Sequence, residues 1–163
     1  MTTMTEKGIV ITRIFDAGRE RVWRAWTNPI EFMSWWGPKG FTSPAASIEF
    51  RVGGWYLNCM RGPGPDGVVK DYWSTGEYRE IVPLEKIVYS DSFADEKGNP
   101  VPASYYGMPG EWPLEMTVTV TFNSIGDKTE MILQHEGIPA GTMTEECREG
   151  WSQSFDKLEE ILK

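Results

Sequence analysis

Alternation of apolar and polar residues predicts that much of the chain is β-strand. In residues 114–122, "LEMTVTVTF", every second residue is apolar, and Glu or Thr occupies the positions between. This period of two is typical of a strand with one buried face. The apolar face consists of Leu114, Met116, Val118, Val120 and Phe122. Further strands are predicted over residues 7–15, 46–52, 55–60, 71–82, 85–94 and 129–136.

Glycine and proline mark the connections between these strands. A Gly-Gly pair at 53–54 predicts a tight reversal, and residues 62–67, "GPGPDG", predict an exposed hairpin loop. These glycines do not indicate a phosphate-binding loop, because Pro63 and Pro65 have no N–H group to donate. Residues 94–113 hold four prolines and three glycines and form the longest irregular segment. A loop of that length is either functional or mobile.

Two short helices are predicted between the first and second strands. The first has apolar residues at positions 22, 25 and 26, and Asp16 is its expected N-cap. Asn28-Pro29 ends it and begins the second helix, because Asn caps a helix well and Pro suits its first position. The second helix ends at the Gly-Pro pair 37–38. Its apolar face consists of Phe32, Trp35 and Trp36.

A long amphipathic helix is predicted near the C-terminal end of the sequence. Thr142 and Glu145 have the spacing of a capping box. Apolar residues then recur every three or four positions and mark one face. That face consists of Met143, Cys147, Trp151, Phe155, Leu158 and Leu162. At 1.5 Å per residue such a helix is about 30 Å long, which is enough to cross a curved sheet.

The predicted order is one strand, two short helices, six strands and one long helix. Consecutive strands with the helices set apart are typical of an α+β fold with an antiparallel sheet. A chain of 163 residues suits one hydrophobic core. We therefore expect residues 1–163 to form a single domain.

Charge and cysteine content narrow the classes of partner. The chain has 24 acidic and 16 basic residues, a net charge of −8, which argues against nucleic acid and anionic membranes as partners. Cys59 and Cys147 form no metal-binding or redox motif, and one histidine makes a transition-metal site improbable. No apolar run has the length of a signal peptide or a membrane span. We expect a cytoplasmic protein with free thiols and without a cofactor or membrane insertion.

Seven motifs follow one another along the chain. They are "VWRAWTNP", "FMSWWGPKGF", "VGGWYLNCM", "GPDG", "GEYREIVPLEKIVYSDSF", the hairpin from "TVTVTF" to "HEGIP", and "EGWSQSFDKLEEIL". In this order they resemble the activator of heat-shock protein 90 ATPase homologue-like family, within the START and Bet v 1-like superfamily, also called SRPBCC. The resemblance implies a helix-grip fold. In that fold a seven-stranded curved antiparallel sheet surrounds a long C-terminal helix, with two short helices between strands 1 and 2.

The same resemblance implies three hypotheses about function. Relatives hold lipids, sterols or other apolar molecules between the sheet and the long helix, so a small hydrophobic molecule is the first expected partner. The eponymous co-chaperone stimulates a chaperone ATPase, so a protein-interaction module with a chaperone partner is the alternative. Some relatives catalyse cyclisations or hydrolyses in the same cavity, which makes a cyclase or hydrolase the third. Because the residues assemble no catalytic constellation, we expect a binding protein rather than an enzyme.

His135 is the only histidine of the chain. Alternation along residues 129–136 places it on the same side as Met131 and Leu133, so it is expected to point inward near the start of the long helix. A core histidine bonded to the backbone or to a neighbouring side chain is the simplest interpretation. Two other interpretations remain open. His135 could form a hydrogen bond to a ligand, or it could act as a general base, because imidazole titrates near neutral pH.

The adjacent tryptophans 35 and 36 allow two interpretations. Aromatic residues at helical spacing are usually core. In a helix-grip fold, however, the short helices approach the long one at a single end, where one indole could anchor the helix and its neighbour could close the cavity as a lid. Tyrosines could supply polar groups to an apolar pocket or direct their hydroxyls to water. The candidate ligand-binding residues are Trp35, Trp36, Phe41, Tyr56, Tyr78, Tyr89, Met116, Val118, Leu133, His135, Trp151 and Phe155.

Overall fold

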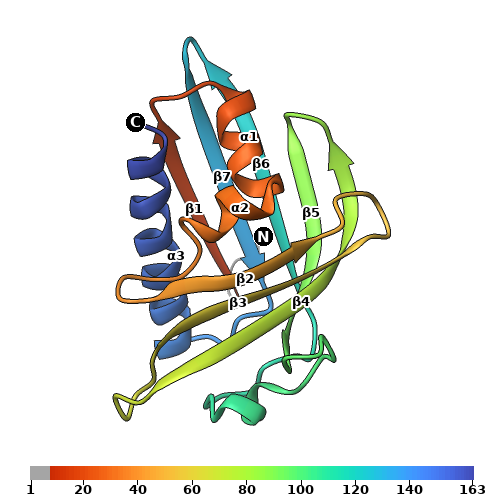
Figure 1. Cartoon of the computed structure of the whole chain (residues 1–163), viewed down its shortest axis with the longest axis vertical. Helices are drawn as coiled ribbons and strands as arrows, with labels where there is room; N and C mark the ends of the chain where they lie inside the picture. Colours follow the sequence, from red (N-terminus) through yellow and green to blue (C-terminus); the bar gives the residue numbers. More distant parts are fainter. Residues whose placement is uncertain (1–7) are drawn as a thin grey trace.

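The computed structural model describes residues 8–163 and contains one seven-stranded sheet, three α-helices and a short 3-10 helix at Ala103–Tyr106 (Figure 1). The strands are β1 (Gly8–Phe15), β2 (Thr42–Ile48), β3 (Trp55–Pro63), β4 (Val69–Val82), β5 (Lys86–Ala94), β6 (Met116–Ile125) and β7 (Lys128–Glu136). The helices are α1 (Arg19–Thr27), α2 (Pro29–Met33) and α3 (Thr142–Ile161). Residues 1–7 lie outside the described part of the chain. They include residue 7, where the first predicted strand begins, and most of the N-terminal segment, for which the sequence predicts no signal peptide.

The sheet has the strand order β1-β7-β6-β5-β4-β3-β2, and every neighbouring pair is antiparallel. It is strongly curled, so that β2, β3 and β4 run across the direction of β1, β7 and β6, and α3 lies alongside β1 (Figure 1). The connection from α2 to β2 closes over α3, because the Lys157 ammonium group donates to the carbonyl oxygen of Phe41 at 3.1 Å. The predicted α+β helix-grip fold, with two short helices between β1 and β2, is confirmed.

Both predicted short helices form, but the second ends earlier than predicted, and one of the two predicted caps is wrong. Helix α2 ends at Met33 rather than at the Gly-Pro pair 37–38, so Trp35 and Trp36 lie in the turn that follows it. The side chain of Asn28 accepts hydrogen bonds from the backbone N–H groups of Ile30 and Glu31 at 3.0 and 3.1 Å and caps α2. Asp16 does not cap α1, whose N-cap is Gly18 and has no side-chain hydrogen bond. Helix α1 starts three residues after Asp16, which is too late for that side chain to cap it.

The second strand lies earlier in the sequence than predicted. It spans Thr42–Ile48 instead of 46–52, and Val52 is 59% exposed in the turn that follows. The predicted reversal is confirmed, since Gly53 has a φ of 85° and Gly54 has no room for a side chain against the Glu49 carbonyl oxygen. Proline is tolerated at position 44 because β2 is an edge strand, where one row of N–H groups needs no partner.

The strand that shows the clearest alternation is confirmed from Met116 onward. Four of its five predicted inward residues have exposed fractions of 3% or less: Met116, Val118, Val120 and Phe122. Leu114 is an exception, because β6 begins at Met116 and Leu114 is 57% exposed in the preceding loop. His135 is buried on β7 together with Met131 and Leu133, as the alternation predicts.

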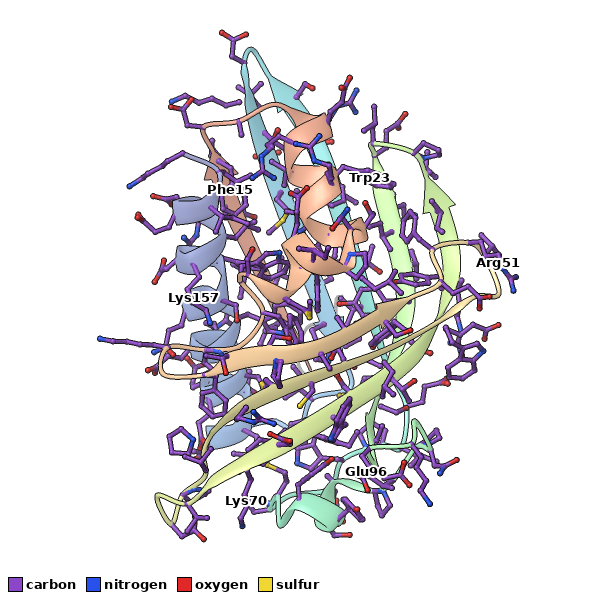
Figure 2. The ribbon with its side chains drawn as sticks, viewed as in Figure 1. Phe15, Trp23, Arg51, Lys70, Glu96 and Lys157 are labelled. Atoms are coloured by element: carbon purple, nitrogen blue, oxygen red, sulfur yellow. The ribbon has the colours of Figure 1, made fainter. Side chains whose placement is uncertain are left out.

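Helix α3 begins without the predicted capping box. Its N-cap is Gly141, with a φ of 97° and no side-chain hydrogen bond, and Thr142 is already inside the helix. The Thr144 hydroxyl instead donates to the carbonyl oxygen of Pro139 at 2.8 Å. The later part of the helix buries Trp151, Phe155 and Leu158. Charged side chains lie at the periphery, as Arg51, Lys70 and Glu96 illustrate (Figure 2).

A candidate ligand pocket beside the first half of the long helix

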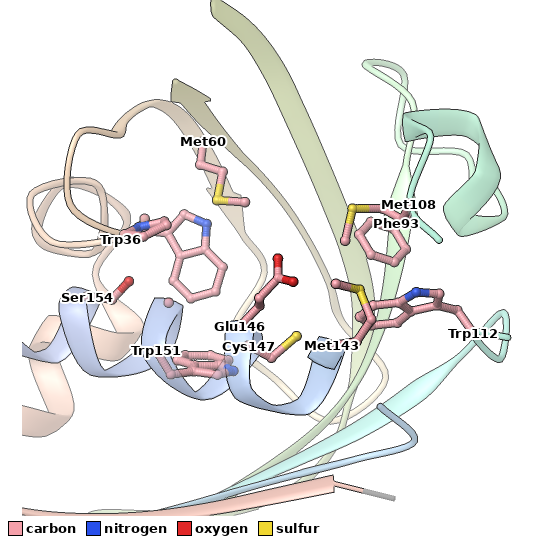
Figure 3. A pocket seen from close by; sticks show the side chains of 13 residues that line it. Trp36, Met60, Phe93, Met108, Trp112, Met143, Glu146, Cys147, Trp151 and Ser154 are labelled. Atoms are coloured by element: carbon pink, nitrogen blue, oxygen red, sulfur yellow. The ribbon is translucent and has the colours of Figure 1, made fainter. Parts of the chain in front are cut away.

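A pocket of about 340 Å³ lies beside the N-terminal half of α3 (Figure 3). Its walls come from α3, the connection from α2 to β2, strands β3 and β5, and the loop between β5 and β6. An engineered protein cavity of about 150 Å³ holds a benzene molecule, so this pocket has room for about two such rings. The lining residues are Trp36, Gly37, Pro38, Met60, Phe93, Met108, Trp112, Met143, Glu146, Cys147, Gly150, Trp151 and Ser154.

The helical wall consists of two neighbouring rows of side chains. Residues four positions apart lie on the same face of an α-helix. Met143, Cys147 and Trp151 form one row, and positions 146, 150 and 154 form the next. Gly150 widens the pocket, because a methyl group built there would have its nearest neighbour, the Pro38 side chain, at 4.0 Å.

The opposite wall combines strand residues with residues of the irregular loop. Phe93 lies on β5 and meets the Trp112 ring edge-on, with the ring centroids 5.4 Å apart. Trp112 is itself held in the loop, because its indole N–H donates to the carbonyl oxygen of Pro109 at 2.8 Å. The Tyr106 hydroxyl anchors the middle of the same loop to β4, accepting from the Trp73 N–H at 3.1 Å.

The two adjacent tryptophans have different positions. Trp35 is fully buried, and its indole N–H donates to the Ala25 carbonyl oxygen at 2.9 Å. Trp36 lines the pocket and meets Trp151 edge-on, with centroids 5.2 Å apart. One indole is therefore a core anchor, and its neighbour forms part of the pocket wall.

A buried polar chain lies behind Trp151. The Trp151 indole N–H donates to Nδ1 of His135 at 3.0 Å, so the imidazole accepts there and carries its proton on Nε2 when neutral. Nε2 faces Oδ2 of Asp91 at 3.5 Å, which is too long for a good hydrogen bond, and among residues 8–163 no other group pairs with it. The other Asp91 oxygen accepts from the Tyr56 hydroxyl at 2.8 Å. The chain therefore connects α3, β7, β5 and β3.

Burial sets the protonation of His135 and Cys147. It lowers the pKa of His135 despite the opposing attraction of Asp91, so the imidazole is neutral at neutral pH. Burial also raises the pKa of the Cys147 thiol to about 11, with smaller contributions from the carboxylates of Asp91 and Glu146. The thiol facing the pocket is consequently protonated and apolar in character.

Two of the twelve candidate ligand-binding residues, Trp36 and Trp151, line this pocket. Seven of the others belong to the buried core: Trp35, Tyr56, Tyr78, Met116, Val118, Leu133 and Phe155. Tyr89 packs in the same core, with its ring centroid 5.3 Å from that of Tyr56. His135 is one hydrogen bond away from the pocket through Trp151. Phe41 lies outside the lining, where it packs against Tyr72.

Several lining residues were not among the candidates. Met143 and Cys147 belong to the predicted apolar stripe of the helix, of which only Trp151 and Phe155 are candidates. Met108 and Trp112 lie in the predicted long loop, whose length was the available signal. Phe93 and Met60 continue the alternation of β5 and β3 toward the pocket, which no local pattern distinguishes from burial in the core.

The described residues contain no metal-binding cluster and no membrane-spanning helix. Within residues 8–163 no three His, Cys, Asp or Glu side chains come together in a way that could hold a metal ion. No helix of that range is both long and apolar enough to cross a membrane.

The family model described as "Activator of Hsp90 ATPase homolog 1-like protein" matches residues 16–163. The chain belongs to this family. A solved structure of a protein from Chromobacterium violaceum is 30% identical, with 96% of both chains covered and a TM-score of 0.76. A second, from Mycobacterium smegmatis, is 22% identical over 98% of this chain and 93% of that one, also with a TM-score of 0.76.

A third relative carries the family name in its description. The AHSA1 protein from Silicibacter pomeroyi is 22% identical, covers 95% of this chain and 96% of its own, and has a TM-score of 0.69. At that identity the likeness to the second and third structures concerns the fold alone. The comparison with curated proteins found no match. The predicted family and its SRPBCC-type fold are therefore confirmed, and the descriptions of the solved structures named above do not specify a ligand.

Proposed function

We propose that this member of the family binds a small hydrophobic molecule in the pocket beside the first half of α3. The pocket supports the proposal because it joins a volume of about 340 Å³ to walls made mostly of aromatic, methionine and cysteine side chains. Clefts of this size and character are typical of small-molecule sites.

Burial of apolar ligand surface would supply the binding free energy. Removing about 400 Å² of apolar surface from water, counted over the ligand and the pocket together, contributes about 10 kcal/mol. Part of this is spent on the lost freedom of the ligand, so we expect dissociation constants in the micromolar range or weaker for a simple apolar probe. His135 then acts on the ligand indirectly, because its hydrogen bond holds the Trp151 indole that forms one wall.

A pocket-filling variant tests the proposal. The neutral fluorescent dye N-phenyl-1-naphthylamine should bind the unmodified protein, with a rise in its emission and one site by titration. Gly150→Leu should remove this site, because the new side chain would enter the open space beside Pro38. Glu149→Leu is the matched control, because Glu149 is the preceding residue of the helix, is exposed and does not line the pocket.

The outcomes separate the possibilities. Loss of the dye site in Gly150→Leu with retention in Glu149→Leu supports the proposal. A protein that binds neither the dye nor other apolar probes, or a Gly150→Leu variant that binds the dye as well as the unmodified protein, contradicts it. Far-ultraviolet circular dichroism of both variants checks that each is folded.

Interaction with a chaperone ATPase is the second candidate, and the description of the matching family model supports it. It is tested with the purified Hsp90-type chaperone of the same source and a measurement of its ATPase rate. Stimulation that survives Gly150→Leu would assign this activity to a surface other than the pocket. An ATPase rate unchanged at a large excess of this protein rules the candidate out.

One pair of residues could in principle suggest catalysis, but its position argues against a role in the pocket. His135 and Asp91 are the kind of titratable pair that a cavity-based cyclase or hydrolase needs, with Nε2 and Oδ2 3.5 Å apart. Neither residue lines the pocket, because Trp151 lies between His135 and the pocket space. A general base must reach the proton that it removes, so this pair does not support an enzymatic role in the pocket.

A further inference from the structure

The pocket has one charged residue among its lining side chains. Glu146 stands on α3 in the same row as Gly150 and Ser154, and its carboxylate points away from the helix toward the middle of the pocket (Figure 3). Within residues 8–163 no Lys or Arg side chain forms an ion pair with it, whereas the preceding Glu145 pairs with Arg148 at 3.8 Å. The carboxylate therefore faces the pocket without a cationic partner from the described chain.

Aromatic side chains form much of the remaining wall. Trp36, Trp112 and Trp151 contribute three indoles, and Phe93 adds a fourth aromatic ring. The face of an indole attracts a cation through the negative charge of its π-system, more strongly than the other aromatic side chains do. A group of indoles with one carboxylate is thus electrostatically suited to an ammonium head group.

We propose that the pocket selects hydrophobic monocations, namely molecules with an apolar body of about two rings in volume and a quaternary or protonated amine as head group. The proposal rests on the proposed function and specifies its ligand class. The apolar body would lie against the methionine, cysteine and aromatic walls. The head group would lie beside Glu146, which is an exposed residue. Because the head group keeps part of its hydration there, the cost of desolvating its charge is small.

The charges around the pocket disfavour an anionic ligand. No Lys or Arg of the described residues is among the lining side chains. Lys157 lies near the lining, but its ammonium group donates to the backbone oxygens of Pro38 and Phe41 and its side chain does not line the pocket. Cys147 is a neutral thiol at neutral pH, because its pKa is raised to about 11 by burial. The net charge of −8 adds a general attraction for cations.

Three probes with one phenylbutyl body test the selectivity. They are (4-phenylbutyl)trimethylammonium, the neutral 4-phenylbutan-1-ol and the anionic 4-phenylbutanoate, each titrated by calorimetry. We expect the cation to bind about tenfold more tightly than the alcohol and the anion to bind more weakly than both. Raising the salt concentration to about 0.5 M should weaken the binding of the cation and leave the binding of the alcohol unchanged, because screening acts on charges alone.

Glu146→Gln and Glu145→Gln form a matched pair of variants. They remove the same charge from neighbouring positions of α3, but Glu146 alone of the two lines the pocket. In Glu146→Gln the advantage of the cation over the alcohol should fall from about tenfold to about twofold, with the affinity for the alcohol unchanged. Glu145→Gln should retain the full advantage.

Each result has a definite meaning. Equal binding of cation and alcohol overturns the selectivity and leaves the proposed function intact. Absence of binding by all three probes overturns both. A cation preference that Glu145→Gln and Glu146→Gln reduce equally overturns the assignment to Glu146, because the preference would then come from the net charge of the protein.

Discussion

The two halves of α3 carry one continuous apolar stripe but meet different surroundings. In the second half, Phe155 is fully buried, and its ring lies 6.1 Å from that of Trp35 and 6.5 Å from that of Phe15. In the first half, Met143 and Cys147 are only partly buried and line the pocket. The comparison shows that the stripe alone does not determine whether a side chain lies in the core or lines the pocket. The residues that face the side chain from the opposite side determine it.

Trp151 marks the boundary between the two halves. One side of its indole stacks on Trp26, with centroids 6.2 Å apart, and belongs to the core. Trp36 meets it at 5.2 Å, and both rings line the pocket. Because its N–H is bonded to His135, the ring is fixed in orientation. A rigid boundary of this kind allows a dense core and an open pocket to share one helix.

The largest predicted difference between the halves is in stability. Phe155→Ala should lower the free energy of unfolding by about 3–5 kcal/mol, because it opens a cavity among aromatic rings that cannot collapse onto it. Met143→Ala should cost less than about 1 kcal/mol, because that side chain is already in contact with the pocket space. Urea denaturation of both variants measures the contrast. Equal losses would mean that the first half is packed as densely as the second.

The adjacent tryptophans should repeat this contrast on a smaller scale. Trp35→Phe should lower the free energy of unfolding by about 2 kcal/mol, because it reduces a fully buried side chain and leaves the Ala25 carbonyl oxygen without its donor. Trp36→Phe should cost less than about 1 kcal/mol and should weaken binding of N-phenyl-1-naphthylamine several-fold. Denaturation and dye titration of both variants test this. The assignment of anchor and wall is wrong if Trp35→Phe affects only the dye.

The boundary between the halves should be sensitive to pH. The folded pKa of His135 lies below its ordinary value because of burial, so below about pH 6.5 the unfolded chain takes up a proton that the folded chain does not. Stability is therefore full above that pH and falls with pH until the folded pKa is reached, by at most about 1.4 kcal/mol per pH unit. Since Nδ1 accepts from Trp151, protonation also breaks the bond that fixes this ring.

Urea denaturation between pH 5 and 8 measures this effect. His135→Gln is the reference, because the chain has no other histidine and the variant loses the only group that titrates near pH 6.5. The carboxylates contribute the same background to both proteins. Parallel curves for the two proteins over this range would exclude the predicted role of His135 burial.

The sequence predicts the fold well in segments where the buried side chains recur at a regular spacing. Alternation along residues 116–122 and the spacing of apolar residues in α3 both follow directly from which side chains avoid water. Asn28 is recognisable as a cap from the sequence because its side-chain oxygen accepts from backbone N–H groups only two and three residues further along the chain. Asp16 and Thr142 fail as caps because a capping residue must immediately precede its helix, and the backbone before α1 and α3 places glycines there.

The pocket is less predictable, for a physical reason. Cys147 and Phe155 are both apolar members of the same stripe, and only the distance to the opposite wall makes one a lining residue and the other a core residue. Likewise, Asp91 becomes the neighbour of His135 through the pairing of β5, β6 and β7, which no local pattern contains. Two local signals point to the pocket: the loop of residues 94–113, which contributes Met108 and Trp112, and the pair of adjacent tryptophans, which contributes Trp36.

The smallest predicted effect concerns Gly150, the glycine of α3 that lines the pocket. Glycine inside a helix costs about 0.5–1 kcal/mol relative to alanine, and a methyl group at Gly150 would meet nothing closer than 4.0 Å. Gly150→Ala should therefore raise the free energy of unfolding by about that amount while slightly weakening dye binding, whereas Ser152→Ala, outside the lining, should leave the dye unaffected. Thermal denaturation and dye titration check both effects. A Gly150→Ala variant less stable than the unmodified protein would show that the space beside Pro38 is closed, and the distinction between the two halves of α3 would then disappear at this position.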